Sequence, residues 1–334
     1  MSTYLINYIL MKTVLISGGA GYLGTQLTKH LLKKNKVIIY DKFYFPWLVE
    51  NKKKINNSER LSFLKKDIKD VLVEDFRNVD VVCDLNGIPN DPAAEINPKL
   101  TWEINYRGRL NFANIAKKAG VKRYIFNSTC SVYGFNKNKV DENSKTNPLS
   151  TYAKANLKAE KAVYKLKDKS FFVNILRNST LFGFSNVLRL DLVINIFVYN
   201  LINNKKIIVD GDGRQFRPFI SLNDICKIYD LIILSSKKTS FICNLVSFNS
   251  TIRNIALSIC KILKIKHTYI NFKKKSADLR NYYVLSKNFK KIFRSNFKFS
   301  NFSKEILSLK KEIIKNKIKL NKSTVRMKFY KSLF

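Results

Sequence analysis

The segment ISGGAGYLG, residues 16–24, constrains the fold of this chain more than any other. It begins within TVLIS, a short apolar and β-branched run at residues 13–17 that predicts a buried parallel strand. Residues 22–33 have leucines at helical spacing and predict a helix. Gly18, Gly21 and Gly24 therefore lie between a strand and a helix. Small residues there let the backbone approach a pyrophosphate, which the helix N-terminus can bind.

A carboxylate follows the second predicted strand, VIIY at residues 37–40. Asp41 stands about 20 residues after the glycines, where an acidic residue can accept hydrogen bonds from the adenosine ribose. A carboxylate there repels a 2′-phosphate, so the predicted cofactor is NAD rather than NADP, although the neighbouring Lys42 weakens that preference. The alternative is a purely structural glycine turn. The strand, helix and acid around this turn make a dinucleotide site the better interpretation.

Strands and helices alternate along the first half of the chain. Further strands are predicted in LSFLKKD, VDVVCDL, KRYIFNS and FFVNILR, with helical stretches between them. This alternation predicts an α/β fold with a Rossmann-type, doubly wound parallel sheet and a smaller C-terminal substrate-binding portion. We divide the chain into a candidate N-terminal extension (1–11), an NAD-binding Rossmann domain (12–177), a substrate-binding portion (178–303) and a basic C-terminal helix or tail (304–334).

The chain is strongly basic, with 62 Lys and Arg against 24 Asp and Glu and a net charge of +38. Such a balance is typical of proteins that bind nucleic acid or anionic membranes. The lysines, however, are spread along the whole chain among Asn, Ile, Phe and Tyr, whose codons are also rich in A and T. Nucleic acid is therefore a less favoured partner, and residues 304–334, with ten basic side chains, are its best location.

Cysteines and apolar runs indicate the compartment. Five widely spaced cysteines without a C-x-x-C pair argue against a disulfide framework or a zinc site, and we expect no metal. The longest apolar run, VLRLDLVINIFVYNLI, contains Arg189 and Asp191 and predicts a buried helix rather than a membrane span. Residues 1–10 lack the basic region and cleavage site of a signal peptide, so we expect a cytoplasmic protein.

Several segments together resemble the extended short-chain dehydrogenase/reductases, and among them the NAD-dependent epimerase/dehydratase family that acts on nucleotide sugars. These segments are GGAGYLG, KDIKD, VVCDLNG, WEINYRG, VKRYIFNSTCSVYG, TYAKAN, ILRNSTLFG and DGRQFRPFISLNDI, with a weaker likeness in DLRNYYVLSK. The main likeness runs from about residue 12 to residue 245. It implies NAD as cofactor, a nucleotide sugar as substrate and a homodimer.

The resemblance also implies roles for individual residues. The implied cofactor-binding positions are Gly18, Gly21, Tyr22, Leu23, Gly24, Asp41, Asp67, Ile68, Leu85, Asn86, Gly87 and Asn105. The implied substrate-binding positions are Thr180, Arg189, Arg217 and Arg280, with Arg217 on the nucleotide diphosphate. The implied catalytic positions are Thr129, Tyr152 and Asn156, with Tyr152 exchanging a proton with a sugar hydroxyl and Thr129 relaying it.

Position 156 departs from the family pattern. The family has a lysine four residues after the tyrosine, on the same helix face, where its charge lowers the pKa of the tyrosine and its ammonium holds the nicotinamide ribose. This chain has Asn156 there, and Lys154 and Lys158 lie off that face. Asparagine can donate a hydrogen bond to the ribose but supplies no charge, which predicts an impaired enzyme or a site put to another use. Ser221, where related segments often carry histidine, is a second departure.

The residues after Thr129 distinguish the reactions of this family. Its 4,6-dehydratases carry Asp-Glu there, and its decarboxylases carry a glutamate two positions on, whereas this chain has Cys130 and Ser131. The resemblance therefore implies a nucleotide-sugar 4-epimerase or a closely related sugar-nucleotide oxidoreductase. The alternative is a catalytically inactive NAD-binding regulatory or RNA-binding protein of the same fold, which Asn156 and the net charge favour.

Overall fold

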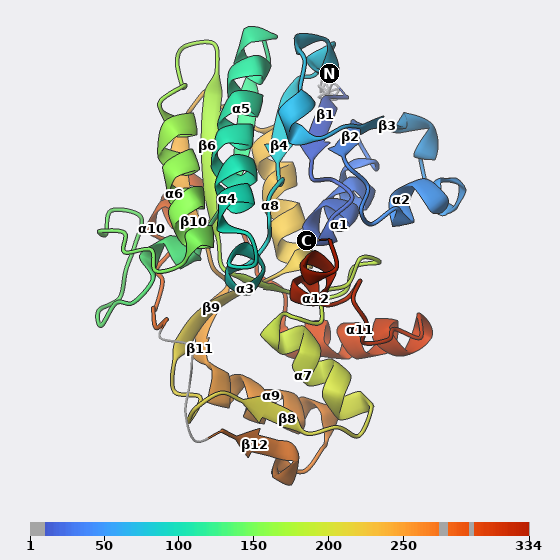
Figure 1. Ribbon diagram of the computed structural model, residues 1–334, viewed down its shortest axis with the longest axis vertical. Helices are drawn as coiled ribbons and strands as arrows, with labels where there is room; N and C mark the ends of the chain where they lie inside the picture. Colours follow the sequence, from blue (N-terminus) through green and yellow to red (C-terminus); the bar gives the residue numbers. More distant parts are fainter. Residues whose placement is uncertain (1–10, 274–279, 294–296, 334) are drawn as a thin grey trace, which may run out of the picture.

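A seven-stranded parallel sheet forms the centre of this computed structural model, which describes residues 11–273, 280–293 and 297–333 (Figure 1). Its strand order is β10-β6-β5-β4-β1-β2-β3. The strands are β1 (Thr13–Ser17), β2 (Lys36–Asp41), β3 (Leu61–Lys65), β4 (Val81–Asp84), β5 (Arg123–Thr129), β6 (Phe172–Asn178) and β10 (Phe241–Leu245). Of the predicted N-terminal extension, residues 1–10 lie outside the described residues.

Helices cover both faces of this sheet, because successive side chains of a strand point to opposite faces. Val14 and Ile16 belong to one core together with residues of α1 (Tyr22–Leu31) and α8 (Leu222–Leu234). Leu15 points the other way, into a second core with residues of α5 (Arg109–Lys118) and α6 (Thr151–Tyr164). The predicted doubly wound α/β fold is confirmed.

The strand order reverses beside β1, whose neighbours are β2 on one side and β4 on the other. In open sheets of this kind, ligands bind in the crevice outside the carboxyl ends of the strands at such a reversal. The glycine loop follows β1 at this point, so the topology places it at the mouth of the crevice.

The smaller part of the molecule lies beyond the carboxyl ends of these strands (Figure 1). Its elements are β7 (Thr180–Phe182), α7 (Val193–Ile202), β8 (Ile207–Val209), β9 (Phe216–Ser221), β11 (Phe248–Thr251), α9 (Ile252–Leu263) and β12 (Ile270–Phe272). Strands β11, β9 and β7 form one sheet, and β12 and β8 form another. The proposed division at residue 177 does not coincide with a division in space, since β10 pairs with β6 and α8 packs against α1 in the larger part.

The segment before β5 is helical as expected but is not one regular helix. It consists of α4 (Pro98–Trp102), a π-helical turn at Glu103–Gly108, and α5. Within the turn, Asn105 accepts a hydrogen bond from the Ile88 N–H at 2.8 Å and donates one to the Ile88 carbonyl at 3.0 Å. The wide turn thus brings this side chain against the loop after β4. Single π-turns of this kind are frequent at functional sites.

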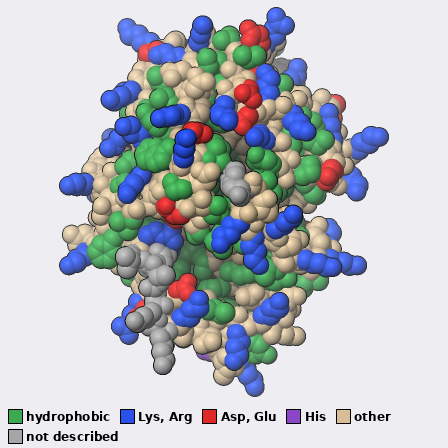
Figure 2. Space-filling model, in the orientation of Figure 1, with side chains coloured by type: hydrophobic (Ala, Val, Ile, Leu, Met, Phe, Trp, Pro, Cys, Tyr) green, Lys and Arg blue, Asp and Glu red, His purple; other side chains and the backbone are tan. Residues whose placement is uncertain are grey.

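The basic C-terminal segment packs on the molecule. It forms α11 (Phe302–Lys315) and α12 (Arg326–Lys331), and Ile306, Leu309 and Ile313 of α11 are buried against α7 and α9. Lysines and arginines are scattered over the whole face shown in Figure 2. Short helices α2 (Trp47–Glu50), α3 (Asp91–Ala94) and α10 (Lys287–Phe293) complete the described elements used below. Among the described helices, none is long and apolar enough to cross a membrane.

Candidate active site

A cavity of about 770 Å³ opens between the two parts of the molecule. It begins at the glycine loop after β1, passes the ends of β4 and β5, and reaches β9. Every residue named above as a candidate cofactor-binding, substrate-binding or catalytic position lines it. The structure therefore brings together nineteen residues that are dispersed from Gly18 to Arg280 in the chain.

The glycine loop is built so closely that side chains would not fit. Gly18 has φ +69°, and a Cβ added there would lie 2.9 Å from the backbone of Asn86. A Cβ on Gly24 would lie 2.5 Å from the Gly19 carbonyl oxygen. The N–H of Gly18 donates to the Tyr40 carbonyl oxygen at 2.9 Å, which ties the loop to β2. The first residues of α1, Tyr22, Leu23 and Gly24, line the cavity, and the N-terminal N–H groups of a helix, which have no partners inside it, can donate to a phosphate.

Asp41 terminates β2 beside this loop. Its Oδ2 accepts from the Ala20 N–H at 3.0 Å and its Oδ1 accepts from the Phe43 N–H at 2.7 Å. Burial raises the pKa of Asp41 above its ordinary value, while these hydrogen bonds act against the rise. Lys42 turns to Asp67, where its Nζ lies 2.9 Å from Oδ2. The lysine beside Asp41 is therefore engaged with another carboxylate.

The remaining cofactor candidates surround the glycine loop. Asp67 precedes a short 3-10 turn that begins at Ile68, and accepts from the Lys69 N–H at 3.1 Å. The hydroxyl of Tyr22 is used within the protein, since it donates to the Gly183 carbonyl oxygen at 2.6 Å and accepts from Asn195. The other candidates follow β4 or lie in the π-turn: Leu85, Asn86, Gly87 and Asn105.

The tyrosine and the threonine predicted to be catalytic lie next to each other. Tyr152 is in the first turn of α6, whose N-cap Ser150 accepts from the Ala153 N–H at 3.1 Å. Thr129 is at the end of β5, and its hydroxyl forms a hydrogen bond with the Tyr152 side chain. Thr129 and Tyr152 are separated by a loop in the sequence, and the fold brings them together at the carboxyl ends of the parallel strands.

The groups around Tyr152 shift its pKa in both directions. Burial raises the pKa of Tyr152 above its ordinary value near 10, and the neighbouring Asp91 carboxylate raises it further. The hydrogen bond with Thr129 and the guanidinium groups of Arg189 and Arg109 lower it in part. Tyr152 is thus protonated at neutral pH and positioned to donate or accept a proton at its hydroxyl.

Asn156 does not face an empty space. Its Oδ1 accepts from Nη1 of Arg109 at 2.8 Å, and its Nδ2 donates to the Tyr152 carbonyl oxygen at 2.8 Å. Arg109 in turn forms a buried ion pair with Asp84 at the end of β4, with 2.9 Å between Nε and Oδ2. The sequence reasoning missed both members of this pair. A carboxylate at the end of an apolar strand, and an arginine directly after the WEINYRG segment, were the available signals.

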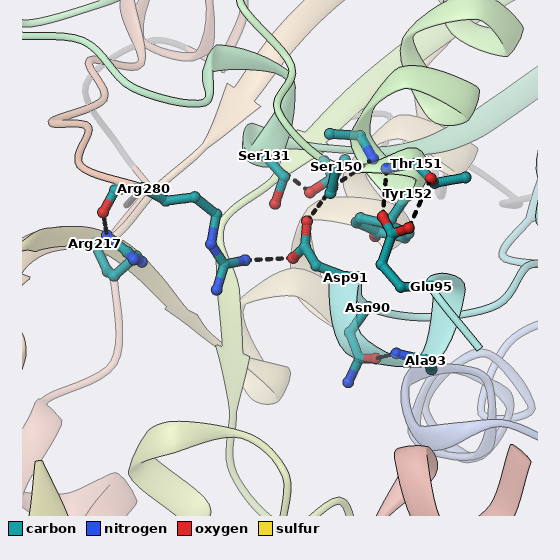
Figure 3. Close-up of polar contacts among 12 residues, drawn as sticks. Asn90, Asp91, Ala93, Glu95, Ser131, Ser150, Thr151, Tyr152, Arg217 and Arg280 are labelled. Atoms are coloured by element: carbon teal, nitrogen blue, oxygen red, sulfur yellow. Dashed lines mark hydrogen bonds and ion pairs between the residues drawn. The ribbon is translucent and has the colours of Figure 1, made fainter. Parts of the chain in front are cut away.

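Two of the candidate substrate residues, Arg217 and Arg280, make polar contacts beside the cavity (Figure 3). Arg280 pairs with Asp91 of α3, which also accepts a hydrogen bond from Ser150. Arg217 of β9 donates to the Arg280 carbonyl oxygen at 2.5 Å. The segment around Arg280 therefore connects the smaller part of the molecule to the helix start that carries Tyr152.

Arg189, a second candidate for phosphate contacts, is almost wholly buried and pairs with Asp191, with 2.7 Å between Nη2 and Oδ2. Thr180 is half-buried at the start of β7. Ser221 lies outside the cavity lining, where its hydroxyl caps α8 by accepting from the Asp224 N–H at 3.0 Å. The second departure from the family pattern is thus a helix cap.

Helix α12 closes one side of the cavity, which the sequence reasoning did not anticipate. Arg326 and Tyr330 line the cavity, and the Arg326 guanidinium lies 3.8 Å from the centre of the Phe45 ring. Phe329 packs against the same ring, with 4.8 Å between the centroids. The C-terminal segment therefore holds the loop that follows β2 and Asp41.

The described residues include no cluster of histidine, cysteine or acidic side chains placed to hold a metal ion. All five cysteines are buried and unpaired. Burial raises the pKa of the Cys226 thiol to about 12, so a reactive thiolate is not supported there.

Known proteins match this chain over most of its length. A protein of Methanocaldococcus jannaschii described as a candidate UDP-glucose 4-epimerase is 31% identical over 223 residues, which cover 64% of this chain and 71% of that protein. The UDP-glucuronate 4-epimerase of Thermodesulfobacterium geofontis is 28% identical over 293 residues, which cover 81% and 86%. Human dTDP-D-glucose 4,6-dehydratase is 27% identical over 263 residues, which cover 76% and 74%.

A solved structure has the same fold. UDP-N-acetylglucosamine 4-epimerase from Methanobrevibacter ruminantium M1, in complex with UDP-N-acetylmuramic acid, superposes with a TM-score of 0.81 at 24% identity and covers 92% of this chain and 99% of that one. The family model described as NAD dependent epimerase/dehydratase family matches residues 14–244, more than half of the chain. The protein belongs to this NAD-dependent family of extended short-chain dehydrogenase/reductases.

Proposed function

We propose that this protein is an NAD-dependent nucleotide-sugar 4-epimerase. The observation that carries the proposal is a continuous cavity, which runs from the glycine loop past Thr129 and Tyr152 to Arg217. Such a path joins a dinucleotide-type glycine loop at one end to candidate phosphate-binding arginines at the other. The curated relatives named as 4-epimerases support this reaction class.

The residues at the glycine end fit NAD. The cradle formed by Gly18 and Gly24 has no room for a Cβ, as expected where backbone approaches a pyrophosphate. The Asp41 carboxylate is oriented by two backbone N–H groups and can accept from ribose hydroxyls. Its charge disfavours a 2′-phosphate, and Lys42 is paired with Asp67. When bound, NAD would accept a hydride from a sugar carbon and return it.

Tyr152 and Thr129 would handle the proton. We propose that the Tyr152 hydroxyl exchanges a proton with the sugar hydroxyl, and that Thr129 orients both groups through its hydrogen bond. Because the pKa of Tyr152 is raised, this residue serves best as the proton donor at neutral pH and as the base only when positive charge lies nearby.

Elimination of water receives less support from the residues after Thr129. Cys130 is buried, and its Sγ donates to the Arg177 carbonyl oxygen at 3.2 Å, with its pKa raised by burial. Ser131 lines the cavity, but a hydroxyl is a weak acid. Neither side chain replaces the carboxylic acid and carboxylate that a 4,6-dehydratase needs. We therefore propose epimerisation although a dehydratase is among the relatives.

The substrate end would bind a nucleotide diphosphate. Arg217 is 6% exposed, lines the cavity, and is oriented by carbonyl oxygens of Phe216 and Arg280. A planar guanidinium held in one orientation on a cavity wall suits bidentate contact with phosphate oxygens. We propose Arg217 as the main diphosphate contact, with Thr180, Arg189 and Arg280 around the sugar and phosphates.

The test is turnover by the purified protein with NAD and a panel of UDP- and dTDP-sugars, with products separated by chromatography and identified by NMR. The expected product is the 4-epimer of one sugar. A 4-keto-6-deoxy product would show a dehydratase instead. NAD binding without any product, together with salt-sensitive RNA binding, would contradict the proposal and favour a binding protein. The same preparation tests the proposed homodimer by light scattering.

A further inference from the structure

A buried guanidinium borders the catalytic part of the cavity. Arg109 is 1% exposed. Its Nε donates to Asp84 Oδ2 at 2.9 Å, and its Nη2 donates to the carbonyl oxygens of Asp84 at 3.0 Å and Asn127 at 2.9 Å. The guanidinium carbon lies 3.6 Å from the centre of the Phe126 ring. The side chain is fixed on these sides, and Nη1 is the edge turned toward α6.

The partner carboxylate is equally buried. Asp84 is 0% exposed, and it also accepts hydrogen bonds from Ser17 at 2.8 Å and Tyr124 at 2.9 Å. Removing two charges from water is costly, and well-packed apolar residues are often as stabilising as a buried ion pair. A buried pair that borders a cavity therefore points to function more than to stability.

Asn156 is shaped to fit this arginine. Its Oδ1 accepts from Arg109 Nη1 at 2.8 Å while its Nδ2 donates to the Tyr152 carbonyl oxygen at 2.8 Å. An ammonium group at position 156 has no acceptor to offer and would oppose the guanidinium. Asparagine and arginine are thus complementary partners.

We propose that Arg109 is a positioning residue of the reaction: it supplies from α5 the fixed positive charge that acts on Tyr152, and Asn156 is the acceptor that holds it there. This inference rests on the proposed function. The charge that the family resemblance leads one to expect at position 156 would thus come from a different helix. Asn156 then completes the site, and its presence does not impair it.

Several other groups near Tyr152 also shift its pKa. Asp91 of α3 raises the pKa of Tyr152, and Arg189, which is paired with Asp191, lowers it, as does Arg109. The aromatic rings of Tyr152 and Tyr330 both pack against the small apolar cluster around α3. Arg109 differs from Arg189 in being tied to α6 itself through Asn156.

The first experiment moves the charge. Asn156→Lys places an ammonium against the Arg109 guanidinium, so we expect a lower melting temperature and no gain in turnover. Asn138→Lys is the matched control, because it makes the same exchange at an exposed position. The double variant Arg109→Met/Asn156→Lys returns to a single cation and should recover melting temperature and turnover relative to Asn156→Lys alone.

The second experiment measures Tyr152 directly. The pKa of Tyr152 is followed by NMR of protein labelled at tyrosine Cζ, assigned with Tyr152→Phe, with NAD present and no nucleotide sugar. Arg109→Met should raise that pKa by roughly one unit, since nearby opposite charge shifts pKa values by about 1–3 units. Asn156→Asp, which keeps Arg109 and neutralises its field, should raise it in the same direction and carries the test if Arg109→Met does not fold.

A purely structural role has a different signature. If Arg109→Met and Asn156→Asp change the melting temperature but leave the pKa of Tyr152 where it was, the inference is wrong. An Asn156→Lys variant as stable as the control and more active would also overturn it. A protein that shows the expected titration shifts but turns over no nucleotide sugar would contradict the proposed function alone.

Discussion

The two ends of the cavity differ in the groups that line them, which are mainly backbone at one end and charged side chains at the other. At the glycine end, the cradle consists of backbone, with φ +69° at Gly18 and one oriented carboxylate, Asp41. At the end proposed for the sugar, the lining includes arginines that form ion pairs: Arg109 with Asp84, Arg189 with Asp191, and Arg280 with Asp91. The first end follows from one short segment, whereas the second is assembled from charges that lie far apart in the chain. Ligand binding at the glycine end should therefore be sensitive to substitutions that add volume. Binding and turnover at the other end should be sensitive to substitutions that change charge.

The largest effect is expected at the sugar end. Tyr152→Phe removes the hydroxyl that exchanges the proton and should lower kcat by about 10²–10⁴, the usual worth of general acid–base help. NAD affinity and melting temperature should stay close to those of the original protein. Turnover with the best sugar, alongside NAD titration by fluorescence, measures both. Retained turnover would remove Tyr152 from the mechanism.

Arg217→Met probes the diphosphate contact. Hydrogen bonds to charged groups contribute about 1.5–3 kcal/mol, so the Kd for UDP should rise by roughly tenfold to a hundredfold. Arg217→Lys is the matched control, since it keeps the charge but loses the planar donors, and should recover part of the affinity. Calorimetry with UDP measures the change. An unchanged Kd in Arg217→Met would place the diphosphate elsewhere.

Gly24→Ala tests the shape of the glycine end. The new Cβ would lie 2.5 Å from the Gly19 carbonyl oxygen, and overpacking of this kind costs about 1–3 kcal/mol. We expect a lower free energy of unfolding in urea and weaker NAD binding. Lys33→Ala, at an exposed position just beyond α1, is the control and should change neither. A Gly24→Ala protein that binds NAD normally would contradict the cradle.

The pH dependence of turnover and of stability tests the raised pKa of Tyr152. Because the folded pKa of Tyr152 is raised, the residue is protonated at pH 7, and oxidation of the sugar should speed up about tenfold per pH unit until that pKa is approached. The free energy of unfolding changes in the opposite direction, since it falls as pH rises. The contribution of Tyr152 is complete below its ordinary pKa near 10 and is lost as pH rises through the folded value. Initial rates between pH 7 and 10 measure the first trend, and urea unfolding followed from pH 9 to above pH 10 measures the second. A rate independent of pH would count against Tyr152 as the base.

The smallest effect is expected at α12, which touches the glycine end from outside. Phe329→Ala removes ring contacts with Phe45 and Tyr44, each worth about 0.5–1.5 kcal/mol. The loop after Asp41 should loosen, and the Kd for NAD should rise a few-fold. Lys328→Ala, exposed on the same helix, is the control. Equal Kd values in the two variants would show that α12 only covers this loop.

Much of this site was predictable because its signals are local. The strand, glycines and helix between Thr13 and Leu31 occur in one continuous segment, and Asp41 ends the next strand. Thr129 and Tyr152 were found through resemblance to family motifs, and the cavity brings them together. The seventh strand, β10, was not separated from the substrate portion, because nothing local distinguishes a strand that returns to the main sheet.

The sequence by itself determined the parallel sheet and the glycine cradle, because periodicity and glycine spacing act over a few neighbouring residues, and its family motifs indicated nineteen of the residues around one cavity. It also showed that position 156 lacks a lysine. Only the tertiary structure shows which groups Asn156 contacts. Arg109 and Asn156 are 47 positions apart, and their contact exists only once α5 and α6 pack on the same face of the sheet. Burial then gives that one charge its influence, since electrostatic interactions are strongest where water is excluded.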